Sequence, residues 1–386
     1  MFLTQEIGSI QRPVWRQKLD APANPEWIRG AARWAKRLGV AEGDELQSLL
    51  KKDGARRSQE EKSRIVEIAS IYVLRMFESV GLDRVFNGEQ PRTEMYDFLA
   101  MNTRGIETAG VLNSFDANYF KKGVIDGPLD VRDEALEFFA SEYRFVAGHT
   151  QRTVKPCLTG PYTMTDWSYV EHHRKRAEAQ GRSGHAALRQ ARHDACLDFA
   201  KHVLNPIVRA LAKEGATVIQ IDEPAAATRE DESDLFTKCV NETFNGVPAH
   251  VEKAVHLCYS NYSSLFPELS DCIADSYLIE FTNHASATSF NPDQVNPESF
   301  KAIEWFNQYG MPVNVGVGVV DIHSDLVETP DVIRDRLLYA AKLVGDPHRV
   351  QVNPDCGLRT RTWDVAFSKL QNMVAGAKLA RAEWGG

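Results

Sequence analysis

The stretch Thr217-Val218-Ile219-Gln220-Ile221-Asp222-Glu223-Pro224 is a short apolar, β-branched run that ends abruptly in two acidic residues. Such a run, bounded by turn-forming residues, predicts a buried strand. Further runs of the same kind lie at residues 3–9, 84–89, 153–159, 254–259, 276–281, 312–319 and 349–353. Amphipathic helical segments separate most of them, for example residues 131–146, 187–213 and 329–343. Eight strands that alternate with helices predict an α/β protein, a closed (β/α)₈ TIM barrel formed by residues 1–386 as one domain.

Two connections are longer than a barrel requires. Residues 24–81, after the first strand, have the composition of several helices with a polar break at residues 51–60, which predicts a helical insertion. Residues 104–128, after the second strand, contain β-like runs around Gly-rich turns, which predicts an inserted hairpin or lid. Neither segment has the low complexity of a disordered linker.

The composition excludes several classes of function. The formal net charge of -8 argues against a nucleic-acid partner, because phosphate binding needs a basic face. No apolar stretch approaches the roughly 20 residues that cross a bilayer, and the first residues lack the basic and apolar segments of a signal peptide. The 6 cysteines are too sparse for a disulfide scaffold, so we expect a cytoplasmic protein.

Polar residues gather at one end of the predicted strands. In parallel barrels the carboxyl ends of the strands form the active-site face, so their residues are expected to converge. The opposite strand ends carry no comparable set, which favours an enzyme over a purely structural barrel. The residues at the carboxyl ends are Ser9, Glu89, Thr159, Asp222, Glu223, His256, Cys258, Glu280, Asp321, His323, Asp355 and Cys356.

A zinc site is predicted among these residues. His256 and Cys258 lie two apart on one strand, so their side chains point to the same side. An imidazole and a thiolate so placed can share one Zn²⁺. Glu280 ends the neighbouring strand and Cys356 follows the last one, which completes a set of four ligands. The remaining cysteines are expected to be core residues, namely Cys157, Cys196, Cys239 and Cys272.

The predicted ligands favour a particular chemistry. Two thiolates and a carboxylate leave a Zn²⁺ site with an overall negative charge. A thiol substrate that joins such a site loses its proton but stays electron-rich, so it can attack an alkyl group. The ligand set therefore predicts thiol alkylation rather than hydrolysis.

Several motifs resemble the C-terminal catalytic barrel of cobalamin-independent methionine synthase, over nearly the whole chain. They are Ile7-Gly8-Ser9, Leu158-Thr159-Gly160-Pro161, Ile221-Asp222-Glu223-Pro224-Ala225, His256-Leu257-Cys258-Tyr259 and Val352-Asn353-Pro354-Asp355-Cys356-Gly357-Leu358-Arg359-Thr360-Arg361. The resemblance implies methylation of homocysteine to methionine, with zinc held by the same four residues. It also implies a set of substrate and catalytic residues: Ser9, Glu89 and Asp222 on the amino-acid end of homocysteine, Trp167 against a folate pterin, and His323 as proton donor.

The sequence also departs from that family. The full-length enzymes carry an additional N-terminal barrel that helps to bind polyglutamylated folate, and this chain is expected to be a short core form without it. Asn118 and Thr228 stand where the resemblance places a basic and an acidic folate contact. We therefore predict a methylcorrinoid as methyl donor, either methylcobalamin or a corrinoid carrier protein as partner. Its cobalt-bound methyl group needs no protonation of the leaving group, so His323 would matter less.

Two alternatives stay open at this point. The first is a zinc-dependent alkyltransferase that joins coenzyme M to an epoxide, but a sulfonate thiol has no ammonium for Glu89 and Asp222 to bind. The second is a non-catalytic zinc-binding or methyl-carrier-binding protein. Structural zinc sites are closed and usually lie away from substrate groups, whereas here an amino-acid pocket is predicted on the face that carries the metal.

Overall fold

The computed structural model describes residues 1–114, 117–258, 261–282, 285–292 and 297–385; the side chains of residues 108–122 and 297–299 are outside that description. The central sheet is entirely parallel, in the order β1-β12-β11-β10-β9-β8-β6. Its strands are β1 (Leu3–Thr4), β6 (Cys157–Thr159), β8 (Val218–Asp222), β9 (Glu252–Leu257), β10 (Ser276–Ile279), β11 (Asn314–Gly318) and β12 (Val350–Asn353).

Two short strands close this sheet into a ring. β2 (Arg84–Val85) pairs in parallel with β5 (Thr153–Val154), and a parallel bridge between Gln5 and Arg84 joins β2 to the chain after β1. β5 and β6 belong to one predicted run, which is divided where Pro156 lacks the N–H that a ladder needs. The ring therefore has eight strand positions, and the predicted (β/α)₈ barrel is confirmed.

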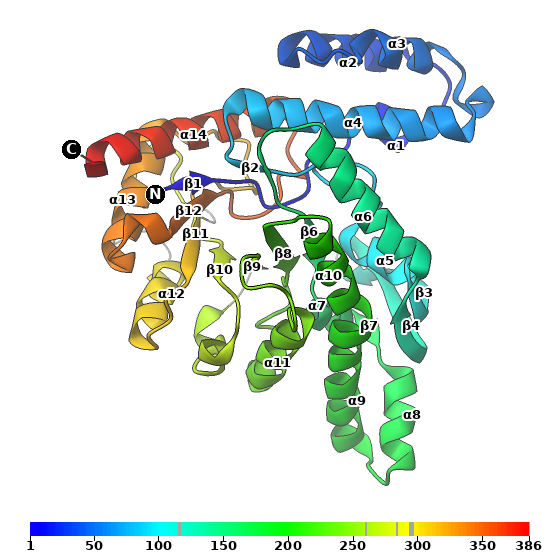
Figure 1. Ribbon diagram of the computed structural model, residues 1–386, viewed down its shortest axis with the longest axis vertical. Coiled ribbons are helices and arrows are strands. Elements are labelled where there is room, and N and C mark those ends of the chain that lie inside the picture. The colour runs from blue at the N-terminus through cyan, green and yellow to red at the C-terminus, as the bar shows by residue number, and fades with distance from the viewer. Residues whose placement is uncertain (115–116, 259–260, 283–284, 293–296, 386) are drawn as a thin grey trace.

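Helices surround the barrel (Figure 1). The predicted segments 131–146, 187–213 and 329–343 correspond to helices in the structure, with a π-helix at Phe199–Leu204 inside the second. The outer helices are α4 (Gln59–Val80), α6 (Asp133–Gly148), α7 (Pro161–Asp166), α9 (Gly184–Asp198), α10 (Asn205–Lys213), α11 (Ser233–Thr243), α12 (Pro297–Gln308), α13 (Pro330–Val344) and α14 (Trp363–Gly385). Short 3₁₀ turns lie at Glu230–Glu232, Tyr262–Leu265, Glu268–Asp271 and Pro347–Arg349.

The predicted helical insertion after β1 is confirmed. It contains α1 (Val14–Gln17), α2 (Pro25–Leu38), α3 (Gly43–Lys51) and a 3₁₀ turn at Gly54–Arg56, and it leads into α4. Figure 1 shows α2 and α3 as an outer layer over α4. Trp34 of α2 packs edge-on against Trp363, with 5.4 Å between ring centroids, which holds this layer on the barrel.

The hairpin predicted after β2 is also confirmed. Following α5 (Met95–Met101), β3 (Thr103–Ser114) and β4 (Ala117–Val131) pair antiparallel, and β4 pairs with β7 (Ser168–Tyr169). The Tyr96 hydroxyl accepts from the Gly123 N–H at 2.7 Å and lies 2.7 Å from Ser168 Oγ. These contacts fasten the hairpin beside the carboxyl ends of the strands.

A pair of helices not foreseen as a unit, α8 (Glu171–Ala179) and α9, extends away from the barrel (Figure 1). None of the helices in the described part of the chain combines the length and apolar character that spanning a bilayer demands.

Candidate active site

A cavity of about 650 Å³ opens at the carboxyl ends of the strands. Of the nine side chains predicted for the site, eight line it: Ser9, Glu89, Trp167, Asp222, His256, Cys258, His323 and Cys356. Glu280 is the exception. The lining also contains residues that sequence reasoning missed, among them Glu94, Met95 and Arg359. Arg359 belongs to the motif that follows Cys356, so its place in the sequence was a signal for it.

The first group of converging side chains, here called the thiol cluster, consists of His256, Cys258 and Cys356. His256 Nε2 lies 3.4 Å from Cys356 Sγ, and the sulfurs of Cys356 and Cys258 are 3.9 Å apart. Bonds of about 2.0–2.3 Å in a tetrahedron place zinc ligand atoms roughly 3.5–3.8 Å from each other. The three side chains therefore fit one Zn²⁺.

Neighbouring groups hold the thiol cluster in place. His256 Nδ1 lies 3.0 Å from the carbonyl oxygen of Leu278, its partner in the β9–β10 register, which directs Nε2 toward the thiols. The Asp355 carboxylate accepts hydrogen bonds from the Phe281 and Thr282 amides at 2.9 and 3.0 Å. It thereby ties the loop that carries Cys356 to the chain after Glu280.

The charges within the thiol cluster favour one thiolate. The hydrogen bond with Cys258 and the neighbouring His256 imidazole hold the pKa of Cys356 well below its usual range, despite burial. Burial alone would lower the pKa of His256, but the charge of Cys356 raises it overall. The pKa of Cys258 is raised, first by its hydrogen bond with Cys356 and then by burial. The cluster thus favours the deprotonated form of Cys356 over that of Cys258.

Glu280 stands next to this cluster rather than inside it. It follows β10 directly and is buried, and its charge contributes to the raised pKa of Cys258. The ligand atoms of His256, Cys258 and Cys356 lie within 4.8 Å of one another, and Glu280 is not a member of that group. Its role as the fourth ligand stays a prediction.

The second group, here called the carboxylate cluster, consists of Glu89, Cys157 and Asp222. Their ligand-type atoms lie within 4.8 Å of one another, and Cys157 Sγ donates to Glu89 Oε1 at 3.5 Å. Burial raises the pKa of Asp222 to about 6. Cys157 is buried, as predicted, but it also contacts a predicted substrate-binding residue, which sequence reasoning missed.

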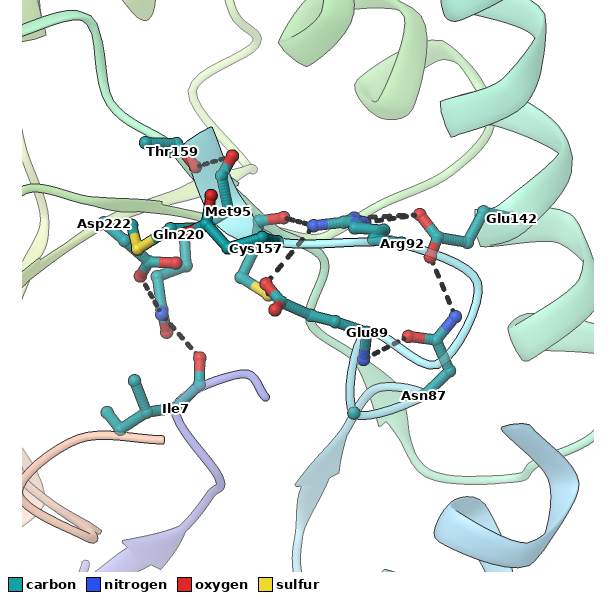
Figure 2. A network of polar contacts seen from close by, with 12 residues as sticks. Ile7, Asn87, Glu89, Arg92, Met95, Glu142, Cys157, Thr159, Gln220 and Asp222 are labelled. Carbon is teal, nitrogen blue, oxygen red and sulfur yellow. Dashed lines mark hydrogen bonds and ion pairs between the residues drawn. The ribbon is translucent and has the colours of Figure 1, made fainter. Parts of the chain in front are cut away.

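Glu89 has a strained backbone that its surroundings maintain. Its φ is +56°, a left-handed conformation that non-glycine residues rarely adopt. The Glu89 N–H donates to Asn87 Oδ1 at 3.0 Å, and the Asn87 amide donates to Glu142 at 2.9 Å. Arg92 pairs with Glu142 at 2.8 Å and lies 3.5 Å from Glu89 (Figure 2). This network aims the Glu89 carboxylate at Cys157 and Asp222.

The two adjacent acids at the end of β8 have different tasks. Asp222 belongs to the carboxylate cluster, where its Oδ1 accepts from the Gln220 amide at 2.5 Å. Glu223 turns away and accepts from the Tyr162 and Thr163 amides at 3.0 and 2.7 Å, which caps the first turn of α7. Glu223 therefore caps a helix, whereas Asp222 belongs to the cavity.

The other predicted residues lie around the mouth of the cavity. Ser9 follows β1 and packs against Gly357, where an added Cβ would lie 2.7 Å from Ser9 Oγ. His323 is exposed, and its backbone N–H donates to Asp321 Oδ1 at 2.7 Å. Trp167 is half-buried, 6.3 Å from the ring of Tyr96. Tyr259 and the side chain of Asn118 lie outside the described residues.

Comparisons with known proteins agree with this geometry. The family model described as the catalytic domain of cobalamin-independent synthase matches residues 40–379. A methionine synthase of Thermoplasma volcanium is 33% identical over 82% of this chain and 89% of its own length. One from Thermococcus kodakarensis is 30% identical over 85% and 87%.

Solved structures show the same fold. A B12-independent methionine synthase from Shewanella, in complex with selenomethionine, superposes with a TM-score of 0.72 at 22% identity, over 99% of this chain and 98% of that one. A protein from Listeria monocytogenes, described as a putative vitamin-B12-independent methionine synthase, has a TM-score of 0.63 at 17% identity and full coverage of both chains.

Proposed function

Because the chain belongs to the cobalamin-independent methionine synthase family, we propose that it is a homocysteine S-methyltransferase that forms methionine within one catalytic domain. The observation that carries the proposal is that the thiol cluster and the carboxylate cluster face one cavity. One end suits a substrate sulfur and the other an amino-acid ammonium group. Homocysteine carries both.

In this proposal His256, Cys258 and Cys356 hold a zinc ion, with Glu280 as the fourth ligand. The distances within the thiol cluster and its low-pKa thiol support this assignment. Bound zinc would lower the pKa of the substrate thiol, so that the thiol reacts as a thiolate at neutral pH.

The carboxylate cluster binds and orients the amino acid. Glu89 and Asp222 take the ammonium group, because two carboxylates, one buried and one partly buried, compensate one cation and offer it charge-assisted hydrogen bonds. The Ser9 hydroxyl and nearby backbone N–H groups take the carboxylate. The preformed network around Glu89 reduces the ordering cost of binding.

The reaction transfers a methyl group to sulfur. The thiolate sulfur attacks the methyl carbon, an S–C bond forms, and the leaving group keeps the electron pair of the broken bond. With a folate donor the departing nitrogen needs a proton, and we assign its donation to His323, which lines the cavity. Trp167 offers a face for a flat ring on the same cavity.

The identity of the donor belongs to the proposal. The sequence predicts a methylcorrinoid, free or on a carrier protein, whereas the matching family is described as cobalamin-independent. The comparisons give the corrinoid and its carrier no support, so both stay predictions, as does the cytoplasmic location.

The test is methionine formation from homocysteine by zinc-loaded protein, with methylcobalamin and methyltetrahydrofolate in parallel reactions. Methionine from methylcobalamin alone supports the corrinoid prediction, and methionine from the folate alone contradicts it. Methionine from neither donor contradicts the proposed function, and coenzyme M with an epoxide is then the next assay. A metal-free preparation serves as control and is expected to be inactive until zinc is restored.

A further inference from the structure

Two arginines, Arg12 and Arg359, follow β1 and β12 at the point where the two loops meet. Ile10 and Leu358 form a parallel bridge between these loops, which brings Arg12 close enough to Arg359 for their charges to interact. Arg359 lines the catalytic cavity. The main chain is anchored here, because the Trp363 indole donates to the Gln11 carbonyl at 2.7 Å. Arg12 therefore lies within charge range of Arg359, Glu89 and Glu94, which all line the cavity.

Arg12 feels the charges of Glu89 and Glu94, but part of its guanidinium group lacks a hydrogen-bond partner. Its Nε and Nη2 atoms are buried and have no hydrogen-bond partner among the described residues. Burial, and then the charge of Arg359, lowers the pKa of Arg12 to about 10. Arg359 itself donates from Nη2 to the Thr93 carbonyl at 3.3 Å. Buried donors without partners are costly, and two adjacent cations add repulsion.

The nearest carboxylates are engaged elsewhere. Glu94 accepts from the Tyr96 and Asp97 amides, both at 3.0 Å, as the N-terminal cap of α5. Glu89 lies against Arg92 and Cys157. An anion supplied from outside would give the two guanidinium groups the partner that the chain withholds.

We propose that Arg12 and Arg359 form an anion-binding subsite at the rim of the cavity, which takes a carboxylate or phosphate group of the methyl donor. Paired guanidinium groups bind both anions through charge-assisted, bidentate hydrogen bonds. The subsite rests on the proposed function, in which homocysteine occupies the two clusters and Ser9. A cavity of about 650 Å³ leaves room for a second, larger substrate beside that small amino acid.

The first test needs no methyl transfer. Inorganic phosphate is titrated by calorimetry into the wild-type chain, the Arg12→Gln/Arg359→Gln double variant and an Arg29→Gln control, which changes an exposed arginine of α2. We expect the double variant to bind phosphate about tenfold more weakly than the other two proteins. Equal binding by all three, or binding by none, overturns the subsite.

Thermal unfolding separates this subsite from a structural role. Arg12→Gln removes an unpartnered, repelled cation, so its Tm in phosphate-free buffer is expected to equal or exceed that of the wild type. Added phosphate is expected to raise the Tm of the wild type and leave that of the double variant unchanged. A lower Tm for Arg12→Gln in phosphate-free buffer would show that the side chain stabilises the fold, against the proposal.

The second test identifies the source of the anion. With an active donor, the double variant is expected to raise the KM for that donor about tenfold and leave the KM for homocysteine unchanged. Two comparisons of KM then show which anionic group is bound. Methylcobinamide lacks the nucleotide phosphate that methylcobalamin carries, and monoglutamylated methyltetrahydrofolate has fewer carboxylates than the triglutamylated form. A rise in the homocysteine KM alone overturns the proposal, because the arginines would then bind the amino-acid carboxylate. If the wild type is inactive with every donor, the proposed function fails while the phosphate titration still decides the subsite.

Discussion

The thiol cluster and the carboxylate cluster contain three ligand-type side chains each, on one cavity of one barrel, yet they suit different partners. In the thiol cluster, two sulfurs and an imidazole lie at the mutual distances of soft metal ligands. In the carboxylate cluster, two carboxylates and a protonated thiol are oriented by a network of side chains. Proximity alone therefore does not define a metal site; the hardness and the protonation of the donors decide it.

The carboxylate cluster also extends into the barrel, whereas the thiol cluster ends at the loops. Glu6 lies within charge range of Glu89 and Asp222 of the carboxylate cluster. Its two carboxylate oxygens are buried and have no hydrogen-bond partner among the described residues. Burial raises its pKa to about 8, although Lys155 acts in the opposite direction. Several carboxyl groups that are costly to ionise thus lie close together at this end of the barrel. Stability and substrate binding there should therefore depend on pH.

The largest expected effect is on the thiol cluster. Cys356→Ala removes a zinc ligand together with the low-pKa thiol, so we expect zinc affinity to fall by more than about 100-fold and methionine formation to disappear. Metal analysis after gel filtration and the activity assay measure both. Cys196→Ala, which changes a buried cysteine of α9, is the control and should retain zinc. Full zinc occupancy in Cys356→Ala would refute the assigned ligand set.

The next effect concerns stability at the carboxylate end. Because the folded-state pKa of Glu6 is raised from 4.5 to about 8, its protonated form stabilises the fold at low pH. That contribution is lost as the pH rises from about 4.5 through about 8. Glu6→Gln keeps the neutral form, so at pH 7 it should be more stable than the wild type by about 3 kcal/mol, and equally stable near pH 4.

Urea unfolding curves of both proteins across this pH range measure the difference. Parallel pH profiles for the wild type and Glu6→Gln would show that Glu6 is charged in the folded protein, which would refute the argument from burial.

A smaller effect is expected on substrate binding. Asp222→Asn removes one charge opposite the substrate ammonium, so the KM for homocysteine should rise about tenfold while the zinc content stays constant. In the wild type the same loss should occur as the pH falls below about 6, where Asp222 takes up a proton. The variant should lack this pH dependence. A loss of zinc from Asp222→Asn would mean that the two clusters are not separate in function.

The smallest effect distinguishes two cysteines. Cys157→Ser keeps a hydrogen-bond donor beside Glu89, so the KM for homocysteine should change by less than about threefold, with zinc unaffected. The same substitution at Cys258 should release zinc, because a serine hydroxyl is a poor replacement for a thiolate ligand. Equal responses of the two variants would remove the distinction between the clusters.

The sequence by itself determined the barrel and most of the cavity lining. Eight short apolar runs that alternate with helices and have polar carboxyl ends predict a closed parallel sheet, and such a sheet places Ser9, Asp222, His256 and Cys356 on one face whatever their separation along the chain. Both insertions were also predictable from the sequence, because helical composition and Gly-rich turns are local properties of the chain.

Only the tertiary structure decided which partner each side chain at that face contacts. That Asp222 faces the cavity while Glu223 caps α7 depends on a helix that begins after another strand. That Cys157 meets Glu89, and that Arg12 meets Arg359, depends on barrel closure, which brings distant strand ends within hydrogen-bonding or charge range. Periodicity specifies the face on which a side chain lies, but hydrogen bonds and charge–charge contacts depend on distances that the folded chain alone sets.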